Sequence, residues 1–346
     1  MQYRFHRFVA FVAVLVCVAC GSSKEHVDAP KTATSTSATP VASDAPSASA
    51  DTASSSVPTQ IQLPTQITVW KPLLYRIGGA KPSYLFGTIH IPDDRLTSSP
   101  SDSLKGAFHD AEEVVTELPL DDTSPAHAMQ LASMPSGKSL SSELPKATYD
   151  RLKAVFVEKH LELAFPMMEH VKVWAVGIQI GLLDHIQEMM SGSKKPIDVV
   201  LHDRAKALNK RTSGLETETE QLNVFDTLTK DEQSRFLEEA LDERDKDVRE
   251  HRDSFAALMN LYLAGEEAPL LAQLNAGFDV QKPLDQKLLK RLITDRNKIM
   301  TDRIVAKLKT APPRVYLFAV GAAHLLGDDG IVAQLKKKGM TVERVP

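Results

Sequence analysis

Two histidines occur in nearly the same sequence context near opposite ends of the chain. Residues 84–90 read YLFGTIH and residues 316–324 read YLFAVGAAH, so His90 and His324 each stand three positions after a glycine. Both apolar runs are typical of strands buried on both faces, and open α/β sheets bind ligands at the carboxyl ends of such strands. The glycine lets the backbone turn sharply or come close to a ligand or a neighbouring strand. If the two strands are neighbours, both imidazoles face one cleft.

A carboxylate with a similar placement is Glu117, which closes a Val-rich segment at residues 113–118. An acid at the end of an otherwise buried strand is costly unless it is paired or bound to a metal. Two imidazoles and one carboxylate form a common ligand set for a catalytic divalent cation, and zinc, manganese and cobalt all suit it. Such an ion lowers the pKa of its bound water and polarises a carbonyl, which is hydrolytic chemistry. A lone histidine at a strand end is usually a hydrogen-bonded structural residue, but the duplicated context favours a shared site.

Composition and motifs remove several other classes of function. Both cysteines, Cys17 and Cys20, lie near the N-terminus, so the body has neither a cysteine nucleophile nor a disulfide. The formal net charge of −4 gives no basic surface for nucleic acid. The sequence also lacks a His-Glu-x-x-His helix, a Gly-x-Ser-x-Gly elbow and a phosphate-binding loop. We therefore expect no nucleic-acid partner.

The first residues indicate an export signal. Arg4 and Arg7 precede the apolar run FVAFVAVLVCVA at residues 8–19, which is too short to span a bilayer as a mature anchor. The end of this run resembles a bacterial lipobox in which Cys20 receives the lipid, although Cys17 stands where leucine is usual. The alternative is an ordinary cleaved signal peptide.

These signals divide the chain into three parts. We predict a lipoprotein-type signal peptide at residues 1–19, the lipidated Cys20 and a disordered linker at residues 20–65, and one domain at residues 66–346. The linker is dominated by Ser, Thr, Ala and Pro and cannot bury enough surface to offset its chain entropy. A flexible tether behind a lipid predicts a protein anchored to a membrane of the bacterial cell envelope.

The body alternates β-rich and helical patterns, which predicts a mixed α/β fold. Thr229 and Glu232 form a capping-box pattern that opens a helical stretch reaching residue 263, with Gly265 as its stop. Further helices are expected at residues 148–161, 167–190 and 284–308, and strands at residues 73–77, 83–91, 113–118, 211–216, 314–321 and 340–345.

Five short segments then occur in a characteristic order along the body. They are residues 85–90 (LFGTIH), Glu117, residues 214–217 (GLET) with Gln221, Arg296-Asn297, and residues 321–325 (GAAHL) with Gly327. In this order they resemble the TraB/PrgY/GumN family, which includes the TIKI metalloproteases. The resemblance implies a metal centre formed by His90, Glu117 and His324. It also implies a fold like those of erythromycin esterase and haem-associated lipoproteins, with two related strand-helix halves around a mixed central sheet flanked by long helices.

The same resemblance brings Arg296 and Glu216 to the cleft as catalytic candidates. The Arg296 guanidinium could hold a carboxylate or stabilise an oxyanion, and the alternative is a surface charge beside Asp295. Glu216 could orient a metal ligand or act as a general base. The alternative for Glu216 is an acid that stabilises a helix N-terminus, supported by the neighbouring Thr217.

Together these features favour a secreted or lipid-anchored metal-dependent hydrolase. The most suitable activity is that of a peptidase, with a metal-bound water attacking a peptide or protein substrate. The alternative is a non-catalytic envelope protein that binds or sequesters a peptide or another small ligand. Because all three implied metal ligands are present, the sequence favours the enzyme.

Overall fold

The computed structural model describes residues 70–98, 100–121, 124–183 and 195–346. The predicted signal peptide, Cys20 and the linker lie outside these residues. Within them, no helix has both the length and the apolar character that crossing a bilayer requires.

Six strands form one mixed sheet, which confirms the predicted mixed α/β fold. They are β1 (Leu73–Ile77), β2 (Ser83–Thr88), β3 (Glu113–Thr116), β4 (Arg211–Gly214), β5 (Tyr316–Gly321) and β6 (Val342–Arg344). Their order in the sheet is β4-β3-β5-β2-β1-β6. The first four in this order run parallel, whereas β1 is antiparallel to both β2 and β6. All six predicted strand segments are confirmed, although five of them are shorter than predicted.

The two Tyr-Leu-Phe runs lie side by side in the middle of the sheet, as the repeat suggested. β2 and β5 pair in parallel, with Tyr84 opposite Leu317 and Thr88 opposite Gly321. Every residue of β5 is buried, and so is nearly all of β2, which explains why neither run alternates polar and apolar side chains. The carboxyl ends of both strands therefore reach the same edge of the sheet.

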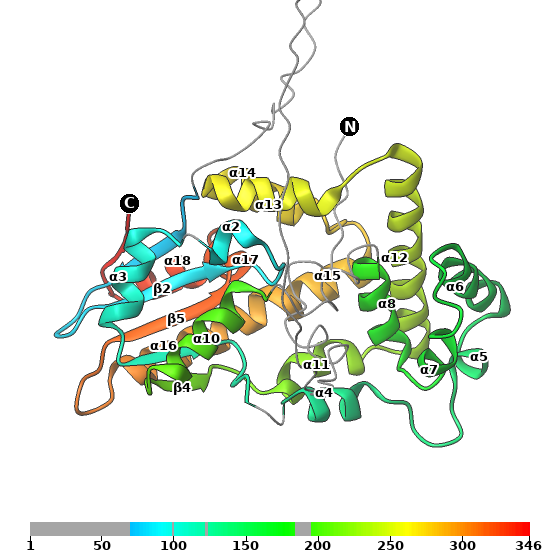
Figure 1. The fold of residues 1–346 in the computed structure, drawn as a ribbon, viewed down its shortest axis with the longest axis horizontal. Coiled ribbons are helices and arrows are strands. Elements are labelled where there is room, and N and C mark those ends of the chain that lie inside the picture. Colours follow the sequence, from blue (N-terminus) through cyan, green and yellow to red (C-terminus); the bar gives the residue numbers. More distant parts are fainter. Residues whose placement is uncertain (1–69, 99, 122–123, 184–194) are drawn as a thin grey trace, which may run out of the picture.

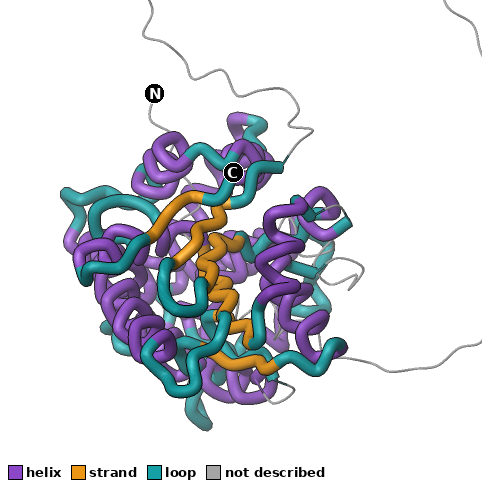
Figure 2. Tube along the Cα trace, turned by 90° about the vertical axis from the view of Figure 1, so that its left-hand side faces the viewer, coloured by secondary structure: helices purple, strands orange, loops and turns teal. Residues whose placement is uncertain are grey.

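Helices cover both faces of the sheet (Figures 1 and 2). These helices are α2 (Asp94–Thr97), α3 (Asp102–Asp110), α10 (Ile197–Ala207), α16 (Arg296–Leu308), α17 (Ala322–Leu325) and α18 (Ile331–Lys337). α3 and α10 lead into β3 and β4 on one face, and α16 and α18 lead into β5 and β6 on the other. The direction of strand addition reverses after β4, and right-handed crossovers then place the later helices on the opposite face.

A second group of helices packs beside the sheet (Figure 1). In it, Trp174 stacks on Phe225, and both rings lie in one continuous core with the sheet. The helices outside the sheet layers are α4 (Ser124–Ala132), α5 (Leu140–Glu143), α6 (Lys146–Glu158), α7 (Phe165–Met168), α8 (Val173–Leu182), α11 (Glu218–Asp226), α12 (Lys230–Glu250), α13 (Ser254–Ala264), α14 (Glu267–Asn275) and α15 (Pro283–Leu289).

The long helix predicted from Thr229 is interrupted. α12 begins with the predicted capping box, but it ends at Glu250, and its C-cap is His251, whose φ of 50° is left-handed. α13 then starts behind its own N-cap, Asp253, whose side chain accepts the N–H of Ala256. The predicted stop at Gly265 is confirmed, because this residue caps α13 with a φ of 65°.

Two other predicted helices also differ in detail. The pattern at residues 167–190 gives α7 and α8, and its last residues lie outside the described part. The pattern at residues 284–308 gives α15 and α16 joined by a π-helical turn at Lys290–Asp295. Such turns hold one extra residue and occur frequently at functional sites. This turn ends directly before Arg296.

Candidate functional site

Four candidate residues follow four neighbouring parallel strands. Glu216 follows β4, Glu117 follows β3, and His90 follows β2, while His324 lies on α17 directly after β5. Because the strands are ordered β4-β3-β5-β2, the residues come in the order Glu216, Glu117, His324, His90 along the edge of the sheet. The parallel part of the sheet therefore gathers the predicted site residues at the edge where open α/β sheets bind ligands.

Both imidazoles turn their Nε2 atoms towards one carboxylate oxygen. Nε2 of His90 lies 3.8 Å from Oε1 of Glu117, and Nε2 of His324 lies 3.9 Å from the same atom. All three residues are buried, with at most 6% of any of them exposed. The structure thus brings together the three residues that the sequence implied as metal ligands.

The other ring nitrogen of each histidine lies against an acceptor. Nδ1 of His90 is 3.1 Å from Oδ2 of Asp198, a carboxylate that only accepts, so Nδ1 carries the proton. Nδ1 of His324 is 2.6 Å from Oδ1 of Asn297, whose Nδ2 donates to the carbonyl of Asp329 and so fixes the orientation of the amide. The Nε2 atom of each ring therefore faces the centre of the site.

Glu117 is held in place from three sides. Its Oε1 accepts the backbone N–H of Gly321 at 2.6 Å. Its Oε2 accepts from Arg296 at 2.6 Å and from Gln221 at 3.1 Å. Burial raises the pKa of Glu117, but the positive charge of Arg296 and the two neighbouring histidines outweigh burial and hold this pKa well below its usual range. Glu117 is therefore ionised at neutral pH.

Arg296 joins two buried carboxylates. Its Nη2 donates to Oε2 of Glu216 at 2.7 Å as well as to Glu117, and its Nε lies 3.1 Å from both oxygens of Glu216. Only 5% of Arg296 is exposed, so the alternative of a surface charge beside Asp295 is wrong. Glu216 is equally buried, and the N-cap of α11 is the next residue, Thr217.

A second, more exposed ion pair, between Arg303 and Glu220, lies next to Glu216. Arg303 of α16 donates to the carbonyl of Leu215 and to both oxygens of Glu220. The hydrogen bond from Arg303 is the largest of several contacts that lower the pKa of Glu220 to about 2. A carboxyl whose pKa falls on folding stabilises the fold above its unfolded pKa and loses this effect as the pH falls through its folded pKa.

We therefore expect Glu220→Gln to be less stable than the wild type at neutral pH and this difference in stability to become smaller in acid. The variant should melt below the wild type at neutral pH, and the difference should shrink as the pH falls from about 4.5 towards about 2. Thermal unfolding of both proteins across this range measures the effect. A deficit that stays constant over the range would show that the charge of Glu220 does not contribute to stability.

The buried centre holds more negative than positive charge. It contains one guanidinium, that of Arg296, and three buried carboxylates. Arg296 pairs with Glu117 and Glu216, and Asp198 lies against His90. Burial lowers the pKa of His90, but the nearby carboxylates outweigh burial and raise this pKa to about 10. Burial and the charge of Arg296 lower the pKa of His324 to about 3. A positive charge between the two Nε2 atoms, whether a proton on His90 or a cation, offsets this imbalance.

Within the part of the chain that the structure describes, no group of three His, Cys, Asp or Glu side chains is placed to hold a metal ion as it stands. Ligands about 2.1 Å from a tetrahedral ion lie about 3.4 Å from one another. The 3.8 and 3.9 Å between the imidazoles and Glu117 exceed that spacing by about half an ångström. The donor types, two imidazole nitrogens and one carboxylate, fit a divalent ion.

The glycines of the two repeated motifs allow close contacts. A Cβ on Gly87 would lie 3.2 Å from the Cα of Ala322 on α17, and a Cβ on Gly321 would lie 3.0 Å from Oε1 of Glu117. The Cβ on Gly321 would also lie 3.4 Å from Nε2 of His90. The first glycine therefore lets α17 approach β2, and the second leaves room at the centre.

Gly321→Ala should destabilise the protein by about 1–3 kcal/mol, because the carboxylate that the new methyl group meets is already fixed by its partners. Gly106→Ala in α3 is the matched control, since nothing lies within 4 Å of a Cβ there and alanine favours the helix by about 0.5–1 kcal/mol. Urea unfolding of both variants measures the change in the free energy of unfolding, which should fall for Gly321→Ala and rise for Gly106→Ala. Equal stability of Gly321→Ala and the wild type would contradict a rigid centre.

Asp198 is the site residue that sequence reasoning missed. It lies in the first turn of α10, 108 positions from His90, and its Oδ1 is buried with no hydrogen-bond partner among the described residues. The available signal was an acid on the apolar face of a helical segment, beside Ile197 and one turn before Leu201. A buried acid in such a position needs a partner.

Comparison with known proteins agrees with this geometry. A model of the TraB/PrgY/gumN family matches residues 73–344, a range that contains every site residue described above. The chain is 27% identical over 326 residues to Metalloprotease TIKI2 of Xenopus tropicalis, a match that covers 79% of this chain and 60% of that protein. It is also 27% identical over 320 residues to Metalloprotease TIKI1 of Homo sapiens, covering 79% of this chain and 62% of that protein.

The matches extend beyond vertebrates but not to a solved structure. Metalloprotease TIKI homolog of Amphimedon queenslandica is 25% identical over 315 residues, with 79% of this chain and 61% of that protein covered. The chain spans about three fifths of the length of these curated relatives. No solved structure matches the chain.

Proposed function

We propose that this chain, which belongs to the TraB/PrgY/gumN family, is a metal-dependent hydrolase that cleaves peptide bonds. The observation that carries the proposal is the convergence of two imidazole Nε2 atoms on one oxygen of an ionised carboxylate. Three atoms that bear lone pairs and face one another repel unless a positive charge lies between them. The matching relatives are named metalloproteases, which supports a protein or peptide substrate.

His90, Glu117 and His324 would hold the divalent ion. Zinc, manganese and cobalt all suit this set of donors. When bound, the ion would supply Lewis acidity towards a peptide carbonyl and lower the pKa of water. The excess of buried negative charge supports a divalent cation, because removing charge from water is costly unless an opposite charge compensates it.

The surrounding residues would orient the three ligand side chains and keep them in the protonation states that bind a metal. Asp198 and Asn297 would hold the proton of each ring on Nδ1, which keeps both Nε2 atoms available. Arg296 would keep Glu117 ionised. Of the two roles predicted for Glu216, its contacts favour orientation over general-base catalysis, because both of its oxygens already accept from Arg296.

The function is testable with purified full-length protein. We expect elemental analysis to find a divalent metal near one equivalent, and a peptide library to be cleaved in a reaction that a chelator stops and added metal restores. Cleavage that persists after complete removal of metal would contradict the proposal. Metal binding without cleavage of any peptide would instead favour the non-catalytic binder.

We also propose that the protein is lipid-anchored in the bacterial cell envelope through Cys20. This cysteine directly follows the small residue Ala19 at the end of an apolar run, as in a lipoprotein signal peptide. The mature chain should begin at Cys20 and carry the mass of a lipid on that residue in mass spectrometry. Cys20→Ser should release the protein from the membrane fraction or stall its processing. An unmodified N-terminus produced by cleavage elsewhere would contradict the lipid anchor.

A further inference from the structure

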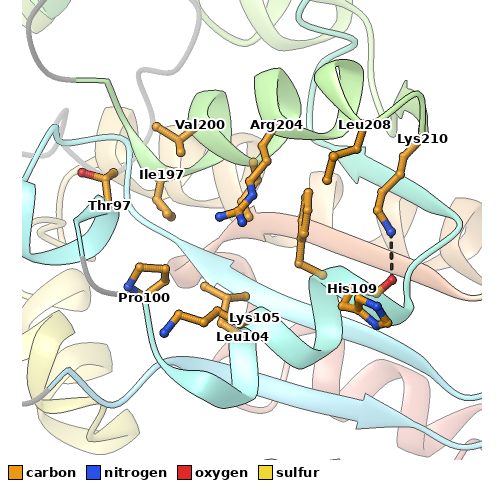
Figure 3. A pocket seen from close by; sticks show the side chains of 12 residues that line it. Thr97, Pro100, Leu104, Lys105, His109, Ile197, Val200, Arg204, Leu208 and Lys210 are labelled. Carbon is orange, nitrogen blue, oxygen red and sulfur yellow. Dashed lines mark hydrogen bonds between the residues drawn. The ribbon is translucent and has the colours of Figure 1, made fainter.

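A cavity of about 160 Å³ lies between α3 and α10, on the sheet face that these helices cover (Figure 3). Its walls are mainly apolar, with cationic side chains among them and no carboxylate. The lining residues that matter for its chemistry are Leu104, Phe108, Val200, Leu201, Arg204 and Lys210. An apolar cavity of about 150 Å³ holds one benzene-sized molecule, so this space accepts a single ring or a short alkyl chain.

The cavity is separate from the candidate centre. None of the centre side chains lines it, and the two sites share only helix α10. Ile197 in the first turn of that helix lines the cavity, whereas the adjacent Asp198 turns to His90. Nothing in the proposed hydrolysis requires this cavity.

Two of the three cations that line the cavity lie over one aromatic ring, and the third, Lys105, pairs with Asp102. The guanidinium of Arg204 lies 5.6 Å from the ring centroid of Phe108, and Nζ of Lys210 lies 5.3 Å from it. Lys210 also donates to the carbonyl of His109 (Figure 3) and to that of Ala111, and these two hydrogen bonds hold its ammonium at the cavity wall. Two positive charges on one ring repel each other and favour a nearby anion.

Arg204 is the group best placed to bind that anion. Figure 3 shows its side chain extending from α10 into the space between the helices. No carboxylate lines the cavity, and Arg204 is exposed, so a ligand that enters the cavity can reach its donors. A guanidinium binds a planar carboxylate through two parallel hydrogen bonds.

We propose that this cavity binds a small amphipathic carboxylate, with its ring or short alkyl body among the apolar side chains and its carboxylate on Arg204. The volume of the cavity limits the size of the apolar part of the ligand, and the positive charges at its wall favour a negatively charged head group. 3-Phenylpropionate meets both requirements, and 3-phenylpropanamide is its neutral counterpart of nearly the same shape.

Calorimetric titration of the full-length chain with these two probes tests the site. We expect 3-phenylpropionate to bind saturably at one equivalent and the amide to bind about tenfold more weakly. Arg204→Gln should reduce the affinity for the carboxylate to that for the amide. Lys206→Gln is the matched control, because it removes one positive charge from the same helix at a position that does not line the cavity.

A second variant locates the probe independently of charge. Val200→Phe fills the cavity and should abolish binding of both probes while the protein keeps a cooperative melting transition. Absence of saturable binding by the wild type would overturn the proposal. It would also be overturned by carboxylate binding that survives Val200→Phe, or by equal weakening in Arg204→Gln and Lys206→Gln.

Discussion

His324→Ala is expected to lose bound metal and nearly all peptide hydrolysis. A three-ligand catalytic site has no spare ligand, and even removing a group that only orients a ligand costs about 10–100-fold in metal affinity. We therefore expect a loss of more than about 100-fold in affinity and a comparable loss of turnover. Elemental analysis after dialysis and a peptide-cleavage assay measure the two quantities.

Thermal unfolding in chelator separates loss of metal from loss of fold. The wild type should melt at a lower temperature once its metal is removed, whereas His324→Ala should not respond to the chelator. His202→Ala is the matched control, because His202 is a buried histidine of α10 that makes no contact with Glu117. Full metal content and full activity in His324→Ala would refute the metal-dependent mechanism.

The core of the sheet was predictable because its strands are buried on both faces. β2 and β5 are short, continuous apolar runs, and runs of this kind are typical of strands that are buried on both faces of a sheet. The duplicated Gly-x-x-His pattern then indicated which two strands end at one place. The parallel pairing of Thr88 with Gly321 confirms that prediction.

The helix interruptions depend on information that the helical pattern does not contain. The apolar periodicity continues past His251, but the chain turns there through a left-handed residue. The side chain of Asp253 then caps the next helix and makes the break favourable. The π-helical turn before Arg296 is likewise set by packing, since residues 284–308 read as one regular helix.

In the candidate site, too, some residues could be identified from the local sequence, whereas others are determined only by how the chain packs. His90, Glu117 and His324 could be identified because each follows a strand-like segment in its own stretch of sequence. Their hydrogen-bond partners lie on helices far along the chain, and the packing of those helices decides which polar groups meet. Asp198 and His90 are 108 positions apart, so no local pattern pairs them.

Arg296→Ala is expected to destabilise the folded protein by about 3–5 kcal/mol, because it leaves buried carboxylates without their counter-charge. Only 5% of Arg296 is exposed, and it donates to both Glu117 and Glu216. Sequence reasoning alone suggested that the guanidinium could hold a carboxylate or stabilise an oxyanion at the cleft, and the loss of such a catalytic group would slow turnover and spare the fold. The observed contacts predict instead that stability and activity fall together.

Two comparisons make the Arg296 prediction decisive. Arg303→Ala removes another arginine of α16 from a pair in which both side chains are 39% exposed, and it should cost only about 0–1 kcal/mol. Combining Arg296→Ala with Glu216→Gln removes one of the stranded charges, so the double variant should recover more than about 1 kcal/mol relative to Arg296→Ala alone. Urea unfolding of metal-free protein measures all three variants without interference from ligand binding. A cost for Arg296→Ala no larger than that for Arg303→Ala would show that solvent, not Arg296, stabilises the two carboxylates, and the buried charge network would then have no structural role.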